Sequence, residues 1–130
     1  MMSRKVSPQR VLIVDDNEDA AESMALVLKL EGHETDFVYS AADALMHAAS
    51  FRPDVVLLDI GLPGMNGYQV AQQMRELPGL KHVRLVAVTG YGRSEDRLRA
   101  REAGFDAHLV KPVDYAVLEK ALRPNQARGA

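Results

Sequence analysis

Short runs of apolar residues alternate with longer segments of helical periodicity along the whole chain. The apolar runs lie at residues 10–15, 35–38, 54–59, 84–89 and 106–110 and are rich in Val, Leu and Ile, which is typical of β-strands. Three of these runs are almost continuously apolar, as expected for strands that are covered on both faces. The pattern therefore predicts a parallel sheet with helices on each side.

Helix signals fill the segments between the runs. The expected helices lie near residues 18–31, 41–50, 67–76, 95–103 and 114–123. Ser40 and Asp43 have the spacing of a capping box, and Gly32 and Gly104 stand where helices end. Apolar residues at helical spacing are interpreted as core: Met24, Val27, Leu28, Leu45, Ala48, Val70, Met74, Leu118, Ala121 and Leu122. No repeat or Pro/Ser-rich linker interrupts the alternation, so a single α/β domain of five βα units is expected.

Polar residues stand at the ends of the predicted strands. With right-handed crossovers and the strand order 2-1-3-4-5, the fold is a doubly wound sheet whose ligand site lies at the carboxyl ends of the strands. This edge would bring together Asp15, Asp16, Asp59, Thr89 and Lys111. A single Asp at a strand end is usually a helix cap or a turn residue, but the set together favours a site. Three neighbouring carboxylates stay ionised near neutral pH only if a positive charge lies among them. Carboxylate oxygens as ligands, without His or Cys, favour Mg2+ as the bound cation.

Composition narrows the class of protein. The chain has 130 residues, 47% of them apolar, and no cysteine, so we expect one compact core without disulfides or a cysteine zinc site. No apolar stretch approaches the ~20 residues of a membrane span, and Asp15 and Asp16 end the first apolar run too early for a secretory signal. We therefore expect a cytoplasmic protein that does not contact a membrane.

Charge is distributed unevenly between the two halves of the chain. The net charge is −2, which offers no basic surface for nucleic acid, so direct nucleic-acid binding is not expected. Residues 1–65 hold 5 Lys and Arg against 11 Asp and Glu, whereas residues 66–130 hold 11 against 7. The four arginines between 93 and 101 alternate with acids, which is typical of a solvated helix face or a surface for a protein partner. His33, His47 and His82 show no metal-ligand spacing and are interpreted as surface or helix-end residues.

Four segments together resemble the receiver domains of two-component response regulators. They are Val11–Asn17, Asp54–Gly67, Val88–Gly90 and Leu109–Pro112, which carry the ordered set Asp-Asp, Asp, Thr and Lys-Pro. The resemblance implies a flavodoxin-like (βα)5 fold. It divides the chain into an N-terminal extension at 1–9, a receiver domain at 10–123 and a C-terminal tail at 124–130. In the family the peptide bond corresponding to Lys111-Pro112 is cis.

The resemblance also implies a role for each site residue. Asp59 would be the phosphoacceptor, taking a phosphoryl group from a phosphohistidine on a histidine kinase or a histidine phosphotransfer protein. Asp16, Asp59 and the backbone carbonyl of Gly61 would bind Mg2+ directly, and Asp15 would act largely through water. Lys111 would neutralise the phosphoryl oxygens.

The switch residue implied by the resemblance is Thr89, whose hydroxyl would turn towards the phosphoryl group. The family usually pairs this Thr with an aromatic residue three positions before the Lys, and here that position is His108. A histidine is smaller than Tyr and can be charged, which predicts that the balance between the inward and outward states of the switch differs or depends on pH. The alternative is that His108 is a plain histidine at the surface. Gly61 and Tyr91 occupy the two positions that tune acyl-phosphate lifetime in the family, and they leave this lifetime undetermined.

The expected function is therefore that of a phosphoacceptor module in a two-component system or phosphorelay, which switches a surface for a downstream protein effector. It would not be an enzyme in the usual sense, because it would promote only its own Mg2+-dependent phosphorylation and dephosphorylation. Few residues follow the last helix, so output is expected through a partner. The loop motifs are similar to receivers of hybrid histidine kinases, and the chain can equally be a free-standing regulator.

Two other functions compete with this interpretation. An aspartyl-nucleophile phosphohydrolase also uses Asp and Mg2+ on an α/β sheet, but it commonly has an acid-base Asp two residues after the nucleophile, where this chain has Gly61. A pseudo-receiver would keep the fold without the chemistry, which the intact acidic set disfavours.

Overall fold

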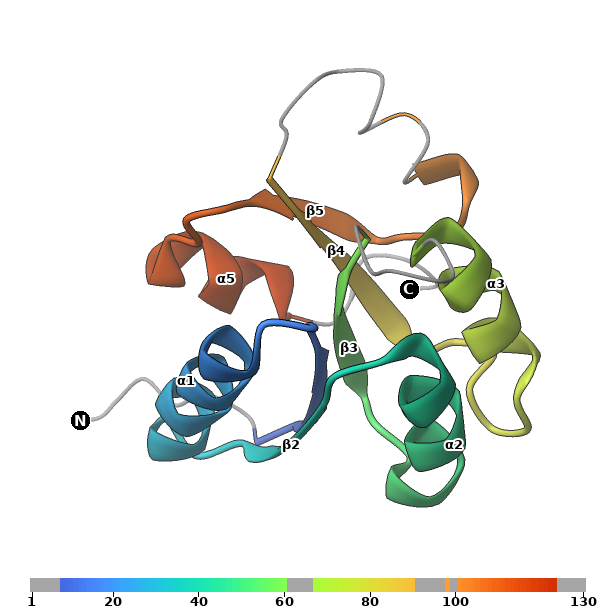
Figure 1. Ribbon diagram of the computed structural model, residues 1–130, viewed down its shortest axis with the longest axis horizontal. Helices are drawn as coiled ribbons and strands as arrows, with labels where there is room; N and C mark the ends of the chain where they lie inside the picture. Colours follow the sequence, from blue (N-terminus) through green and yellow to red (C-terminus); the bar gives the residue numbers. More distant parts are fainter. Residues whose placement is uncertain (1–7, 61–66, 91–97, 99–100, 124–130) are drawn as a thin grey trace.

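Five parallel strands form one sheet with helices on both sides (Figure 1). The computed structural model describes residues 8–60, 67–90, 98 and 101–123. The strands are β1 (Arg10–Val14), β2 (Glu34–Val38), β3 (Val55–Asp59), β4 (Arg84–Thr89) and β5 (Ala107–Val110). Their order is β2-β1-β3-β4-β5, as predicted, so the fold is a flavodoxin-like doubly wound sheet.

Burial follows the position of each strand in the sheet. The three central strands β1, β3 and β4 are buried along nearly their whole length, which explains their continuous apolar sequences. The outer strands β2 and β5 are half-buried and contain polar residues. Neighbouring strands lie in parallel register, for example Asp59 beside Val88 and Thr89 beside Val110.

Four helices are fully described: α1 (Glu18–Leu30), α2 (Ala41–Phe51), α3 (Gly67–Glu76) and α5 (Tyr115–Ala121). The N-cap side chains of Asn17, Ser40 and Asp114 accept hydrogen bonds from backbone amides in the first turns of α1, α2 and α5. The Ser40 hydroxyl accepts from the Asp43 amide, as the capping-box spacing predicted. Gly32, just after α1, has a φ of 105°, which glycine adopts without a steric penalty.

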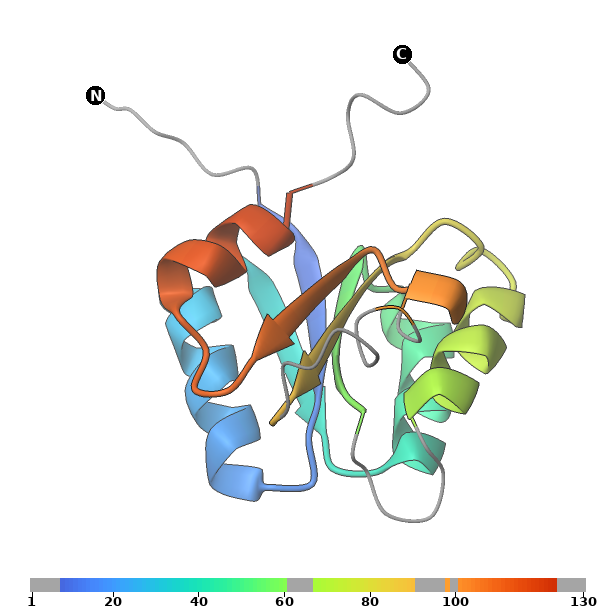
Figure 2. The ribbon, with the colours of Figure 1, turned by 90° about the horizontal axis from the view of Figure 1, so that it is seen from above.

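The sheet separates two hydrophobic cores. Helices α1 and α5 cover one face, and α2 and α3 cover the other (Figure 2). The α2–α3 side contains Leu12, Leu58, Met74 and Leu85, and the α1–α5 side contains Leu28, Leu57 and Leu118, all fully buried. Alternate residues of the central strands point to opposite faces, so each central strand supplies both cores.

Element boundaries differ slightly from those predicted. Strand β2 begins at Glu34, one residue earlier than expected, because the Glu34 amide bonds the Gln9 carbonyl. Helix α5 is shorter than the predicted 114–123, since Asp114 is its N-cap and Leu122 its C-cap. Leu98, Arg101 and Glu102 are helical within the expected helix at 95–103, the rest of which lies outside the described residues or, at Ala103, in a turn.

Two contacts fix the connections around β3, β4 and β5. The Arg75 guanidinium at the end of α3 donates to the carbonyls of Lys81, Val83 and Gly104 and to the Asp106 carboxylate, at 2.6 to 3.0 Å. At the other end of α3, Gly67 approaches so closely that an added Cβ would lie 2.5 Å from the Ile60 Cα.

No helix among the described residues has the length and apolar character needed to span a membrane.

Candidate functional site

Three carboxylates meet at the carboxyl edge of the sheet. Asp15 and Asp16 follow β1, and Asp59 is the last residue of β3, which lies beside β1. One oxygen of each carboxylate lies within 4.8 Å of the other two, and we call these three residues the acidic cluster. Asp15 is buried, Asp59 is partly buried and Asp16 is exposed, so the cluster opens to solvent on the side of Asp16.

Lys111 supplies the positive charge that such a cluster needs. It follows β5, and its Nζ donates to one oxygen of Asp15 and one of Asp59, both at 3.3 Å. Its backbone amide bonds the Thr89 carbonyl at 2.8 Å, and the Lys111-Pro112 bond is cis, as the resemblance implied. The ammonium is thus held from the β4 side of the cluster.

The ionisation of Asp15 and Lys111 reflects this arrangement. Burial raises the pKa of Asp15 above its ordinary value, and the charge of Asp59 adds to this effect; the Asn17 amide and Lys111 oppose it. For Lys111, burial alone would lower the pKa, but the charges of Asp59 and Asp15 outweigh burial and raise it. The site therefore contains a buried carboxylate that is costly to ionise and a lysine that stays charged.

The donor set of the acidic cluster fits a hard divalent cation. All three candidate ligands are carboxylates, without His or Cys, and Mg2+ prefers such oxygen ligands together with retained waters. The exposed position of Asp16 leaves room for those waters. Asp16 and Asp59 would hold the ion, and Asp15 lies beside them. Gly61, whose carbonyl the resemblance implied as a ligand, lies outside the described residues, as does Tyr91.

Thr89 and His108 lie on one side of the sheet beside the cluster. Thr89 is the last residue of β4 and is 5% exposed. His108 pairs with Ala87, two residues before Thr89, so Thr89 and His108 point to the same face. His108 therefore lies on the neighbouring strand, on the same face of the sheet as Thr89 and two positions before the residue paired with it, Val110.

A groove leads to the acidic cluster from the α1 side. Its volume is about 350 Å3, and its walls are mainly apolar and include Met24 from α1, Val113 before α5 and Tyr115 at the start of α5. Asp15, Asp59 and Lys111 form its polar end. The groove thus joins an apolar surface of α1 and α5 to the carboxylates of Asp15 and Asp59.

The remaining histidines lie away from the cluster. His82 is exposed, as expected. His33 follows α1 but is only 4% exposed, so its interpretation as a surface or helix-end residue is wrong; its Nδ1 accepts a hydrogen bond from the Gln9 amide at 3.1 Å. His47 lies on α2 and contacts Asp36 on β2. Neither contact could be predicted from the sequence, since the partners are distant in the chain and follow no motif.

Comparison with known proteins identifies the family. The family model described as the response regulator receiver domain matches residues 11–123. The DNA-binding response regulator MtrA of Mycobacterium tuberculosis is 39% identical over 120 residues, which cover 92% of this chain and 51% of MtrA. The response regulator PleD of Caulobacter vibrioides is 32% identical over 114 residues, 88% of this chain and 25% of PleD. The chain thus spans about half the length of MtrA and a quarter of PleD.

Solved structures agree with this relationship. A CheY-like receiver domain protein from Methanospirillum hungatei is 32% identical, with a TM-score of 0.78 over 88% of this chain and 90% of that chain. The receiver domain of a sensor histidine kinase from Pseudomonas aeruginosa, crystallised with a magnesium ion in its active-site cleft, is 28% identical. Its TM-score is 0.79 over 89% of this chain and 95% of that chain. The chain therefore belongs to the response regulator receiver family and is a receiver domain of two-component signalling.

Proposed function

We propose that Asp59 accepts a phosphoryl group from a phosphohistidine on a histidine kinase or a histidine phosphotransfer protein. The observation that supports this role is the position of Asp59 in the acidic cluster, 3.3 Å from the Lys111 ammonium and at the polar end of the groove. Asp59 also lies at the end of a buried strand, so its backbone is held rigidly. A rigid carboxylate beside a cation is suited to nucleophilic attack on phosphorus.

The transfer exchanges one bond to phosphorus for another. A carboxylate oxygen of Asp59 forms the new O–P bond as the N–P bond to the partner imidazole breaks, and the imidazole leaves with the electron pair. Lys111 lies where its ammonium can offset charge on the phosphoryl oxygens. Asp15 keeps Lys111 in place through its own 3.3 Å contact. These residues thus position the nucleophile and a charge-neutralising group.

Mg2+ is the cofactor that the acidic cluster fits best. When bound, it would supply further positive charge to the transferring group. Asp16 and Asp59 are the proposed direct ligands, with Asp15 acting largely through water and the Gly61 carbonyl as a further ligand. The exposed carboxylate of Asp16 lies within 4.8 Å of oxygens of Asp15 and Asp59, which supports a ligand role.

The output would be a change of shape around β4 and β5. Thr89 ends β4 beside the cluster, and its hydroxyl would turn to donate to a phosphoryl oxygen. The side chain of His108 would move inward or outward as the Thr89 side chain turns. A downstream protein effector would read the changed surface. We do not class the protein as an enzyme, because the only reaction proposed is its own phosphorylation and dephosphorylation.

Phosphorylation by acetyl phosphate with Mg2+, followed by intact mass measurement, tests the proposal. The wild type should gain one labile phosphoryl group, and Asp59→Asn should gain none. Asp54→Asn is a matched control, because Asp54 precedes the same strand β3 at the end opposite to Asp59. Its carboxylate accepts a hydrogen bond from the Arg10 amide. An undiminished adduct on Asp59→Asn would reject Asp59. Acetyl phosphate turnover without an accumulated adduct would instead favour a phosphohydrolase, and neither turnover nor an adduct would favour a pseudo-receiver.

A further inference from the structure

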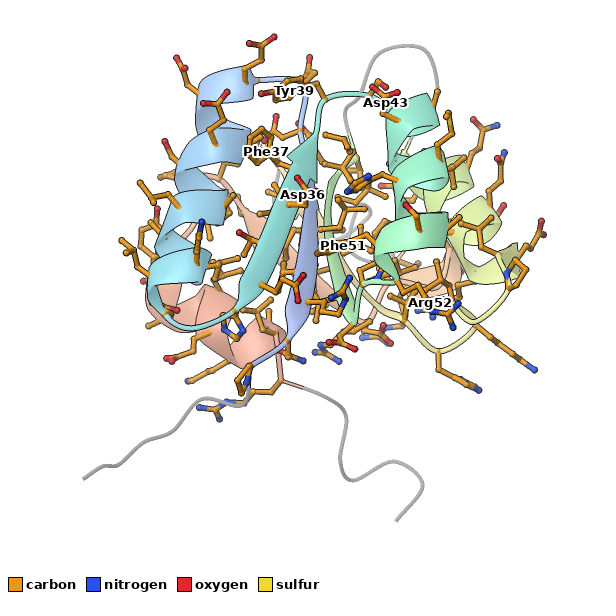
Figure 3. All side chains as sticks on the ribbon, turned by 90° about the horizontal axis from the view of Figure 1, so that it is seen from below. Asp36, Phe37, Tyr39, Asp43, Phe51 and Arg52 are labelled. Carbon is orange, nitrogen blue, oxygen red and sulfur yellow. The ribbon has the colours of Figure 1, made fainter. Side chains whose placement is uncertain are left out.

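The free edge of β2 has backbone groups that point away from the sheet. β2 is the outermost strand beside β1, and Figure 3 shows Asp36 and Phe37 on it between α1 and α2. The Glu34 amide and the Val38 carbonyl bond towards β1. Because backbone groups of successive strand residues point in opposite directions, those of Thr35 and Phe37 face outward. Such an edge is a template for pairing with another strand.

The Asp36 side chain covers one of these outward groups. Its Oδ1 accepts a hydrogen bond from the Phe37 amide at 2.8 Å. The other oxygen, Oδ2, lies 2.6 Å from Nε2 of His47 on α2. His47 thus holds the carboxylate against the strand edge. We call Asp36 and His47 the edge pair.

His47 is itself held in position by its neighbours on α2 and β1. Its ring stacks on Phe51, with ring centres 5.6 Å apart and an angle of 15° between the planes. The Arg10 guanidinium lies 4.4 Å from the centre of the Phe51 ring and donates to the Phe51 carbonyl. Arg10 also pairs with Glu34 at 2.7 Å. A series of contacts therefore runs from Arg10 on β1 through Phe51 to His47, and it holds the ring of His47 against Asp36.

The composition of β2 explains why such cover matters. Apart from Asp36, the segment from Thr35 to Tyr39 consists of Thr, Phe, Val and Tyr, which all favour strands. Two copies of the chain that met across this edge would need the Phe37 amide as a donor. They would also bring two Asp36 carboxylates close together, which is unfavourable.

We propose that the edge pair prevents strand-to-strand pairing between the β2 edges of two copies of this chain. Asp36 does so in two ways, by occupying the Phe37 amide and by placing a negative charge at the edge. His47 fixes the carboxylate in the conformation that does both. This proposal is independent of phosphorylation at Asp59.

Amide hydrogen exchange at Phe37 tests the first part. Asp36→Ala should accelerate exchange of this amide about tenfold, because a hydrogen bond to a charged acceptor is lost. Glu34→Ala is the matched control: it removes the same charge from the same strand, while Arg10 keeps its bonds to the Phe51 carbonyl, so the Phe37 amide should stay covered. His47→Ala keeps the carboxylate and should accelerate exchange less, and it serves if Asp36→Ala does not fold. Equal exchange of the Phe37 amide in wild type and in both edge-pair variants would overturn the proposal.

Sedimentation over a range of protein concentrations tests the second part. Asp36→Ala should associate more strongly than wild type and Glu34→Ala. Adding Thr35→Pro to Asp36→Ala should reverse this, because proline blocks the outward edge position without removing a bond to β1. Association no stronger in Asp36→Ala than in Glu34→Ala, or association that survives Thr35→Pro, would reject β2 pairing.

Discussion

Asp15 is the residue at which the needs of the site oppose those of the fold. Its carboxylate is buried, which raises its pKa, yet the cluster needs it ionised. A carboxylate with a raised pKa in the folded state binds protons more tightly there than in the unfolded chain. It therefore lowers the free energy of unfolding once the pH exceeds its ordinary pKa.

We predict that Asp15→Asn is more stable than wild type at neutral pH without Mg2+. The advantage should shrink as the pH falls and vanish below pH 3.8, the ordinary value, where Asp15 is protonated in both states. Denaturant unfolding of both proteins from pH 3 to pH 7 measures this difference. A constant difference across this range would show that the ionisation of Asp15 is not its cause.

The residues at the strand ends could be predicted because each follows a recognisable apolar run. Asp15, Asp16, Asp59 and Lys111 are brought together as the strand order required. The contacts of Asp36 with His47 and of His33 with Gln9 could not, since they depend on how side chains pack across elements. Arg75 was missed for the same reason, as its four acceptors come from two separate segments, one before β4 and one before β5.

Among the secondary-structure elements, the start of α3 lies so close to the backbone of Ile60 that residue 67 has no room for a side chain. Gly67 donates its amide to the Ile60 carbonyl at 3.3 Å, and Ile60 in turn donates to the Val88 carbonyl of β4. Ile60 follows Asp59 directly. The position of α3 and that of the cluster are thus linked through a single residue.

Gly67→Ala should destabilise the protein by about 1–3 kcal/mol, because the new methyl group would force a buried helix and a strand end apart. Gly90→Ala is the control, since an added Cβ there meets nothing within 4 Å. Thermal and denaturant unfolding of the two variants measure the effect. Equal stabilities would show that the close contact between residue 67 and Ile60 is relieved without cost.

Helices and strands were predictable where the apolar period was unambiguous, and their ends were not. The central strands lie where expected because burial on both faces leaves continuous apolar runs. The start of β2 depended on a bond from Glu34 to Gln9, outside any apolar run. The end of α5 depended on packing of Leu122 after the last helical residue.

At the scale of the whole molecule, the cluster couples cation binding to folding. Three carboxylates repel one another in the folded state and separate in the unfolded chain, so a cation that binds them stabilises the fold. Lys111 forms ion pairs with Asp15 and Asp59, so the exposed carboxylate of Asp16 is the one that a cation from solution reaches most easily.

Mg2+ should therefore raise the melting temperature of the wild type, with a dependence on concentration. Asp16→Ala should show a much smaller increase, because it loses the exposed ligand. Asp19→Ala, which removes a nearby exposed acid of α1, is the control for general charge effects. Equal Mg2+ stabilisation of wild type and Asp16→Ala would exclude Asp16 as a ligand.

Thr89→Val should separate phosphorylation from the change of shape. The variant keeps Asp59, the proposed Mg2+ ligands and Lys111, so it should still accept phosphate. It lacks the hydroxyl that would bind the phosphoryl oxygen, so the surface around β4 and β5 should not shift. Amide chemical shifts of residues 90–110, with and without a beryllofluoride mimic, measure this. Movement as large as in wild type would assign the coupling to another residue.

The ion pair between Asp15 and Lys111 joins residues that are 96 positions apart, which has a consequence for synthesis of the chain. Strands β1 and β3 emerge from the ribosome well before β5, so the carboxylates can meet while their lysine has not yet been added. During that interval Lys111 is absent, and ions from solution can balance the charge of the carboxylates in its place. Translation therefore delivers the neutralising residue last, and a chain interrupted before β5 would carry an acidic cluster without its own cation.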